Sequence, residues 1–312
     1  MPSSAIFPCI TEVFLLFYKN TLTLAQNKNM GYTITKTAVA GAGAMGAGIA
    51  QVFAQAGLTV VLFDVNDTQL EKAKSTINKN IGQAVEKGKL SKTDADVVFS
   101  KITYTTNLTD LKADLIVEAI VEKLEPKQEL FKQLAAINGN QTIFATNTSS
   151  IPVTRIAKDI PLPGRVVGMH FFNPAHIMKL VEIITGAETL PEVAETLKQL
   201  TIKLGKTPVM CKDSPGFIVN RVARHYYVES LKMLEENIAP TETIDALMES
   251  AGFKMGPFKL MDFVGNDINF AVTSSLFESF HHDAKFRPSR IQQQKVDAGH
   301  LGRKTGRGFY GY

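Results

Sequence analysis

Two ionisable residues interrupt apolar stretches that follow one another closely along the chain. His170 stands within the run 166–172, and Glu182 stands within the run 180–184. A lone histidine among apolar residues is more often a hydrogen-bonded core residue than a catalytic base. A carboxylate beside the imidazole would fix its tautomer and stabilise its protonated form, and two buried ionisable groups are costly unless they pair. We therefore interpret His170 and Glu182 as a general base and its partner.

A glycine-rich turn offers a second kind of chemistry, the binding of phosphate. The sequence Gly-Ala-Gly-Ala-Met-Gly at 41–46 follows the short apolar run 37–42 and precedes apolar residues at helical spacing. A strand, turn and helix of this kind let the backbone approach a pyrophosphate, which then lies at the helix N-terminus. The expected dinucleotide contacts in this turn are Gly41, Gly43, Ala44, Met45 and Gly46.

Asp64 ends the next β-branched run, 59–63, at the place where a carboxylate can accept hydrogen bonds from the adenosine ribose. It would also repel the 2′-phosphate of NADP, and the following residues 65–67 contain no arginine. The alternative is a structural turn followed by a solvated aspartate. Because strand, glycines, helix and acid occur in the right order, the sequence favours an NAD site.

The elements that must position these residues alternate between strands and helices as far as about residue 212. Such alternation predicts a mostly parallel sheet. Beyond 213 the pattern is helical with almost no strand signal, so we expect an α/β fold class: a Rossmann-type dinucleotide-binding domain over 30–212 and an all-α domain over 213–312. The predicted strands are 37–42, 59–63, 102–106, 114–120, 142–146, 166–172, 179–185 and 207–212. The predicted helices are 67–89, 126–137, 191–204, 217–238, 241–251 and 261–281.

The composition of the whole chain excludes several other classes of protein. Among 312 residues the net charge is +4, and lysine and arginine are scattered, so a nucleic-acid partner is not expected. Cys9 and Cys211 have no metal-ligand spacing, which indicates no zinc site and a reducing compartment such as the cytoplasm. The apolar stretch 6–17 is too short to span a membrane. We expect residues 1–29 to be an extension or the result of a start codon placed too early, with Met30 as the natural start.

A long motif resembles a known enzyme family. Gly-Met-His-Phe-Phe-Asn-Pro at 168–174, followed by Met-Lys-Leu-Val-Glu at 178–182, is similar to the signature of the L-3-hydroxyacyl-CoA dehydrogenases, which include bacterial 3-hydroxybutyryl-CoA dehydrogenases. The resemblance implies NAD-dependent interconversion of 3-hydroxyacyl-CoA and 3-oxoacyl-CoA. It begins near Lys36, reaches the C-terminus, and also includes the segments 117–122, 147–150, 215–217, 220–221, 256–258 and 302–310.

The resemblance also implies roles for individual residues. His170 matches the general base and Glu182 its partner, while Ser149 and Asn220 match polar groups that hold the substrate oxygens. The implied dinucleotide contacts, beyond the glycine turn and Asp64, are Glu122, Lys127, Ser149, Asn173 and Lys304. The implied coenzyme A contacts are Asn80, Lys87 and Ser149. The lysines Lys72, Lys74, Lys79, Lys87 and Lys89 could form a basic rim for the coenzyme or a solvated helix face.

Two other functions fit the same plan, and the sequence leaves several properties open. The alternatives are a dehydrogenase of a free hydroxy acid, such as L-gulonate or carnitine, and a non-catalytic NAD-binding protein of the lens-crystallin kind. The retained catalytic set argues against the second alternative. Acyl chain length, direction and pathway, whether fatty-acid oxidation or butyrate formation, stay open. We expect a homodimer through the helical domain, because it has more apolar residues than its own core needs: Phe258, Leu260, Met261, Phe263, Ile268, Phe270 and Val272.

Overall fold

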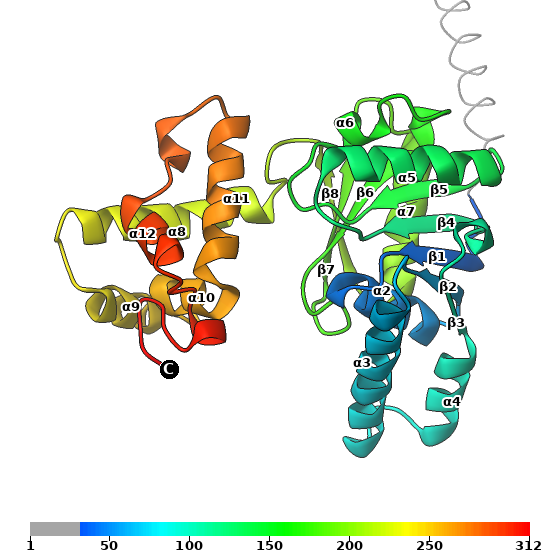
Figure 1. Cartoon of the computed structure of the whole chain (residues 1–312), viewed down its shortest axis with the longest axis horizontal. Coiled ribbons are helices and arrows are strands. Elements are labelled where there is room, and N and C mark those ends of the chain that lie inside the picture. The colour runs from blue at the N-terminus through cyan, green and yellow to red at the C-terminus, as the bar shows by residue number, and fades with distance from the viewer. Residues whose placement is uncertain (1–31) are drawn as a thin grey trace, which may run out of the picture.

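The computed structural model describes residues 32–312, so the expected extension 1–29 and the start at Met30 lie outside the described residues. Figure 1 shows two parts: an α/β part built on one sheet, and a helical part formed by the C-terminal segment. The chain passes once from the first part to the second, after the last strand. This arrangement agrees with the fold class expected from the sequence.

The eight strands form a single sheet in the order β3-β2-β1-β4-β5-β6-β7-β8. All neighbours are parallel except β6 and β7, which are antiparallel. Successive strands run outward on both sides of the β1–β4 boundary, and the carboxyl ends at such a switch point are where open parallel sheets bind ligands. The strands are β1 (Lys36–Ala40), β2 (Thr59–Phe63), β3 (Ile102–Thr105), β4 (Leu115–Glu118), β5 (Ile143–Thr146), β6 (Val166–Phe171), β7 (Leu180–Thr185) and β8 (Thr207–Lys212).

Helices cover both faces of the sheet, and each face has its own apolar core. One face carries α2 (Ala44–Gln55), α3 (Asp67–Glu86), α4 (Lys92–Ser100) and α7 (Pro191–Lys203). The other carries α5 (Leu124–Ile137) and the short α6 (Val153–Ala157). The 3-10 turns η1 (Leu108–Asp110) and η2 (Pro163–Arg165) lie in connections.

The lysine-rich segment differs from its sequence-based prediction. A single helix was expected over 67–89, but α3 ends at Glu86 and α4 follows. Ser91 begins α4, because its hydroxyl accepts a hydrogen bond from the backbone amide of Asp94 at 3.0 Å. Only two side chains of α4, Ala95 and Val98, are buried, so its apolar pattern is too weak to indicate a helix.

The helical part contains α8 (Val219–Glu235), α9 (Thr241–Ser250), α10 (Pro257–Val264), α11 (Asn266–Ser279) and α12 (Arg290–Asp297), with the 3-10 turns η3 (Ala284–Phe286) and η4 (Arg303–Thr305). The expected helix 261–281 is interrupted at Gly265, whose φ is 106°, a value that few residues other than glycine adopt. The core of this part includes Tyr227, Leu231, Phe258 and Met261. Within residues 32–312, no helix is long and apolar enough to cross a membrane.

Candidate active site

A cleft of about 440 Å³ lies where the carboxyl ends of β4, β5 and β6 meet the helical part. The helical part contributes the beginning of α8 and one side of α11. The cleft therefore opens at the carboxyl ends of the strands, near the switch point between β1 and β4. Its lining residues are Met45, Ala119, Ile120, Glu122, Lys127, Asn147, Ser149, His170, Phe171, Phe172, Asn173, Asn220, Ile268 and Val272.

His170 and Glu182 are directly opposite each other on the antiparallel strands β6 and β7. The Nδ1 atom of His170 lies 2.8 Å from Oε2 of Glu182, and the two residues are only 6% and 1% exposed. The other carboxylate oxygen, Oε1, accepts hydrogen bonds from the backbone amides of Ile218 at 2.9 Å and Val219 at 3.0 Å. Glu182 is thus bound on one side to the imidazole and on the other to the N-terminus of α8.

The surroundings of Glu182 favour its ionised form. Burial raises the pKa of this carboxyl, but the hydrogen bonds from His170 and from the amides of Val219 and Ile218 outweigh burial and lower its pKa below the ordinary value. Because an ionised carboxylate only accepts hydrogen bonds, the proton of the neutral imidazole is on Nδ1 of His170. The lone pair on Nε2 is then free to accept a proton. The ring is enclosed by Phe172 and Phe217, with ring centroids at 4.5 and 5.8 Å.

The glycine turn has the shape that a pyrophosphate needs. A Cβ on Gly41 would lie 2.5 Å from the carbonyl oxygen of Ala119, and one on Gly46 would lie 1.7 Å from that of Gly41. Gly43, in contrast, has nothing within 4 Å of its Cβ position. It begins α2, whose first turn has neither a side-chain cap nor an acid. The backbone amides of this first turn have no side-chain partner, and they lie at the positive end of the helix dipole. Both features favour the binding of phosphate here.

Asp64 follows β2 directly beside this turn. Its Oδ2 atom accepts a hydrogen bond from the amide of Ala42 at 2.8 Å, and Oδ1 accepts one from the amide of Asn66 at 3.0 Å. These bonds fix the carboxylate over the turn while leaving it half-exposed. Its residue type and position therefore fit the ribose of a dinucleotide without a 2′-phosphate.

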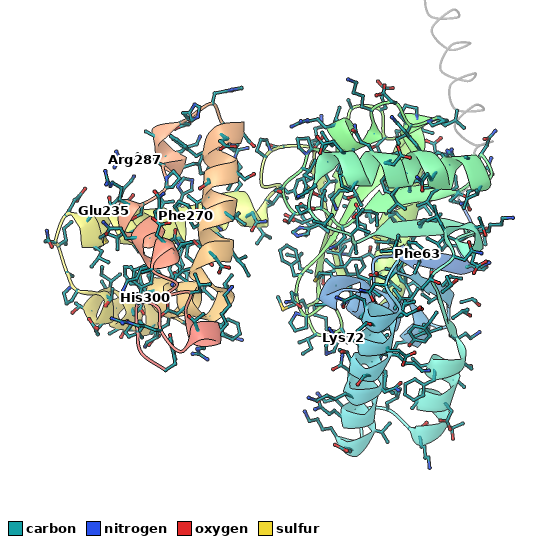
Figure 2. The ribbon with its side chains drawn as sticks, in the orientation of Figure 1. Phe63, Lys72, Glu235, Phe270, Arg287 and His300 are labelled. Atoms are coloured by element: carbon teal, nitrogen blue, oxygen red, sulfur yellow. The ribbon has the colours of Figure 1, made fainter. Side chains whose placement is uncertain are left out.

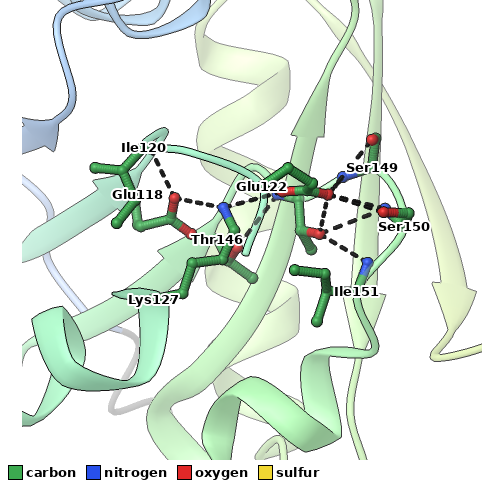
Figure 3. Close-up of polar contacts among 9 residues, drawn as sticks. Glu118, Ile120, Glu122, Lys127, Thr146, Ser149, Ser150 and Ile151 are labelled. Atoms are coloured by element: carbon green, nitrogen blue, oxygen red, sulfur yellow. Dashed lines mark hydrogen bonds and ion pairs between the residues drawn. The ribbon is translucent and has the colours of Figure 1, made fainter. Parts of the chain in front are cut away.

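A charged network joins β4, α5 and the connection between them at the cleft, and Figure 3 shows its polar contacts. Lys127 is 1% exposed, and its Nζ lies 2.6 Å from Oε1 of Glu118 and 3.1 Å from Oε2 of Glu122. Glu118 also accepts hydrogen bonds from the amide of Ile120 at 2.8 Å and the hydroxyl of Thr146 at 2.7 Å. Every atom of this buried pair that carries charge thus has a partner. The sequence did not single out Glu118, because it ends an apolar run with no partner nearby in the chain.

Glu122 connects this network to the segment after β5. Its Oε1 atom accepts hydrogen bonds from the hydroxyl of Thr148 at 2.6 Å, the amide of Ser149 at 2.9 Å, and the amide and hydroxyl of Ser150 at 3.2 and 3.1 Å. Burial raises its pKa, but Lys127 and the hydrogen bonds lower it more, so the pKa is below its ordinary value. Asn220 reaches the same segment from α8, with Nδ2 3.4 Å from the carbonyl oxygen of Ser149.

Of the ligand contacts that the resemblance implies beyond the glycine turn and Asp64, three residues do not line the cleft. Asn80 lies on α3 and donates to Oε1 of Gln51 at 3.1 Å, and Lys87 follows the end of α3. Lys304 is paired with both carboxylate oxygens of Asp267 at 2.7 Å in the helical part. The other lysines of α3 are exposed, including Lys72, which Figure 2 labels. The coenzyme A contacts and the role of Lys304 therefore stay predictions.

Comparison with known proteins identifies the family. Residues 36–214 match the family model described as 3-hydroxyacyl-CoA dehydrogenase, NAD binding domain, and residues 216–312 match the model of the C-terminal domain. The chain belongs to the 3-hydroxyacyl-CoA dehydrogenase family. Its matched N-terminal region makes NAD the cofactor, which the glycine turn and Asp64 fit.

Several known proteins match this chain over most of its length. The chain is 47% identical to Escherichia coli 3-hydroxyadipyl-CoA dehydrogenase over 90% of its own length, but it spans only 60% of that relative. It is 45% identical to a probable 3-hydroxybutyryl-CoA dehydrogenase of Deinococcus radiodurans, covering 89% of this chain and 100% of the other. The crystal structure of (S)-3-hydroxybutyryl-CoA dehydrogenase from Ralstonia eutropha superposes with a TM-score of 0.87 at 39% identity, over 90% of this chain and 99% of that one.

Proposed function

We propose that the protein is an NAD-dependent oxidoreductase that interconverts 3-hydroxyacyl-CoA and 3-oxoacyl-CoA, with 3-hydroxybutyryl-CoA and acetoacetyl-CoA as its substrates. The observation that carries this proposal is the buried His170–Glu182 pair. Glu182 binds one imidazole nitrogen of His170, and His170 lines the cleft beside the dinucleotide turn. The names of the full-length relatives support the choice of a four-carbon substrate.

The side chains around the cleft supply the proton transfer. His170 accepts the C3 hydroxyl proton at Nε2, and the Glu182 carboxylate stabilises the imidazolium that results. In the reducing direction the protonated ring returns this proton to the substrate oxygen. Bound NAD provides the hydride acceptor. The Ser149 hydroxyl and the Asn220 amide are the other polar groups that can hold the substrate oxygens.

The elements around the cleft bind and orient the dinucleotide and coenzyme A. The first turn of α2 and Asp64 hold the dinucleotide, and we assign further contacts with it to Glu122, Lys127 and Asn173 at the cleft and to Lys304. We assign coenzyme A contacts to Asn80 on α3 and to Lys87, which follows the end of this helix. The apolar side chains Phe172, Ile268 and Val272 exclude water from the reacting atoms, which strengthens the interactions of the charged groups.

We further propose that the protein acts as a homodimer in the cytoplasm. Exposed apolar side chains on the helical part support the dimer, but the set differs from the one expected from sequence. Phe258 and Met261 are fully buried in the core of the helical part, so they offer no surface. Two residues of the expected set, Phe263 and Ile268, are at least 50% exposed, and so are four residues outside that set: Val222, Ile238, Leu247 and Phe253.

The experiment that tests the activity is the oxidation of NADH by acetoacetyl-CoA, followed by absorbance. Wild-type enzyme should consume NADH with acetoacetyl-CoA and show little turnover of free acetoacetate or of the oxo forms of L-gulonate and carnitine. Turnover of a free acid without turnover of the thioester would indicate the alternative dehydrogenases. No turnover of any of these substrates by folded, NADH-bound protein would indicate the non-catalytic alternative.

A further inference from the structure

Two carboxylates lie at or just behind the cleft: Glu122, in the connection between β4 and α5, lines it, and Glu182 on β7 lies behind His170. Among the residues that line it, the ionisable side chains are Glu122, Lys127 and His170. Behind them lie the buried Glu118, paired with Lys127, and Glu182, paired with His170. When His170 is neutral, Glu118 and Glu122 share the single positive charge of Lys127, so this cluster keeps one net negative charge, and Glu182 carries a second.

Lys127 favours the ionised form of Glu122 but does not cancel the net charge of the cluster, because it also pairs with Glu118. Lys127 lies closer to Glu118, at 2.6 Å, than to Glu122, at 3.1 Å. Glu118 is fully buried, so it depends on Lys127 for compensation. The remaining partners of Glu122 are neutral hydroxyls and amides, which hold the carboxylate in place without cancelling its charge. The cluster of three side chains therefore carries one negative charge, and Glu122 is the member that presents it to the cleft.

The following step rests on the proposed function, because that reaction moves a positive charge across the cleft. During oxidation, C3 loses hydrogen with two electrons to the nicotinamide ring, and the hydroxyl proton moves to His170. The oxidised ring is cationic and the reduced ring is neutral, so the positive charge disappears from the ring and appears on the imidazole. The total charge in the cleft is unchanged, and only its position differs.

We propose that Glu122 is the counter-charge for the oxidised nicotinamide ring, as Glu182 is for protonated His170, and that the buried Glu118–Lys127 pair keeps Glu122 available for this role. The two carboxylates then stabilise opposite sides of the hydride-transfer equilibrium. At an effective permittivity of about 20, one charge about 6 Å away changes an equilibrium by roughly 10- to 100-fold. The relative affinity for NAD⁺ and NADH is therefore the property that Glu122 sets.

Binding measurements test this role without any acyl thioester. The chain contains no tryptophan, so NADH fluorescence is easily followed, and NAD⁺ is measured by competition. Glu122→Gln should raise the ratio Kd(NAD⁺)/Kd(NADH) about tenfold. Glu118→Gln should raise it by a similar factor although Glu118 does not line the cleft, because Lys127 would then compensate Glu122. Glu125→Gln, the same change at an exposed position early in α5, is the matched control and should leave the ratio unchanged.

A second measurement adds the acyl thioester. It uses enzyme in excess over both the cofactor and the thioester, and it records the fraction of bound cofactor that is present as NADH at equilibrium. Glu122→Gln should increase this fraction and Glu182→Gln should decrease it. An unchanged affinity ratio in folded Glu122→Gln would overturn the inference, and melting curves establish that each variant is folded. If Glu118→Gln does not fold, Glu122→Gln decides alone. A shifted ratio in a protein that does not reduce acetoacetyl-CoA would support the counter-charge and refute the proposed substrate.

Discussion

At the scale of single residues, the site depends on two ionised carboxylates: Glu182 is buried, whereas the side chain of Glu122 is 38% exposed. Glu182 remains charged because an imidazole and two backbone amides donate to it, and Glu122 because a lysine and neutral donors do. Each carboxylate in turn holds a group that faces the cleft, His170 in one case and the Ser149 segment in the other. The same hydrogen bonds therefore provide both stability and the orientation of the reactive groups.

Substitution of the pair should separate catalysis from binding. General-base removal typically costs about 10²- to 10⁴-fold in rate, so His170→Gln should lower kcat by that factor while NADH affinity stays within a few-fold. Glu182→Gln should also lower kcat, and the double variant should lose much less than the product of the single losses, because the two residues act as one unit. Single-turnover rates and NADH titrations measure both effects. A folded His170→Gln protein with a normal rate would contradict the assignment of the base.

Stability should depend on pH through Glu182 in a definite direction. The pKa of this carboxyl is lower in the folded protein than its ordinary value of 4.5, so the charged form favours folding. Its contribution is present above pH 4.5 and is lost as the pH falls through the lowered pKa. The difference in melting temperature between wild type and Glu182→Gln should therefore shrink between about pH 6 and pH 3. A difference that grows on acidification would show that the pKa is raised instead.

At the scale of elements, the strands were the part most readily predicted from sequence. Strands buried on both faces appear as continuous apolar runs, and the runs at 59–63 and 166–172 coincide closely with β2 and β6. Helix α4 was not predicted, and the break at Gly265 was missed because it depends on a local turn inside a helix-like pattern. Short polar helices give little periodic signal.

Only some residues of the candidate site could likewise be predicted from the sequence. His170, Glu182 and the glycines could be identified because they stand out against their own local pattern. The Glu118–Lys127 pair and the capping of α8 by Glu182 could not, because their partners come from separate elements and meet only after folding. Ile218, which begins α8, provides no cap of its own, so a carboxylate from β7 accepts its amide instead. Nothing near Ile218 in the sequence indicates that partner.

The glycine turn allows a test in which fold and ligand binding respond differently. Gly46→Ala would bring a Cβ to 1.7 Å from the carbonyl oxygen of Gly41, so it should destabilise the protein by at least about 1–3 kcal/mol. Gly43→Ala has free space in the unliganded turn, so its melting temperature should stay near that of wild type. Its methyl group would occupy the approach to the amides of α2, and NADH affinity should fall about tenfold, or roughly 1.4 kcal/mol. Unchanged NADH affinity in Gly43→Ala would mean that the phosphates lie elsewhere.

At the scale of the whole molecule, the end of the chain closes the helical part on itself. The buried carboxylate of Asp262 on α10 accepts hydrogen bonds from the backbone amides of Phe309 and Tyr310, both at 2.9 Å. A Cβ on Gly308 would lie within 2.0 Å of the same carboxylate, so only glycine fits there. The terminal aromatic residues thus pack back onto the core, where Phe309 lies against Phe258. The terminal residues thus complete the core of the helical part, and part of its remaining apolar surface faces outward, while Ile268 and Val272 line the cleft.

That outward surface leads to a prediction about assembly. Val222 on α8 and Leu247 on α9 are 67% and 63% exposed, and burying such apolar side chains would favour association. Light scattering at about 10 μM should give twice the chain mass of 34.2 kDa. Val222→Glu combined with Leu247→Glu should shift the protein toward the monomer, because a dimer would have to bury these charges. Val65→Glu, at a position 84% exposed on the α/β part, is the control and should leave the mass unchanged. A wild-type monomer at this concentration would refute the dimer, and a dimer that survives both substitutions would place its interface on another surface.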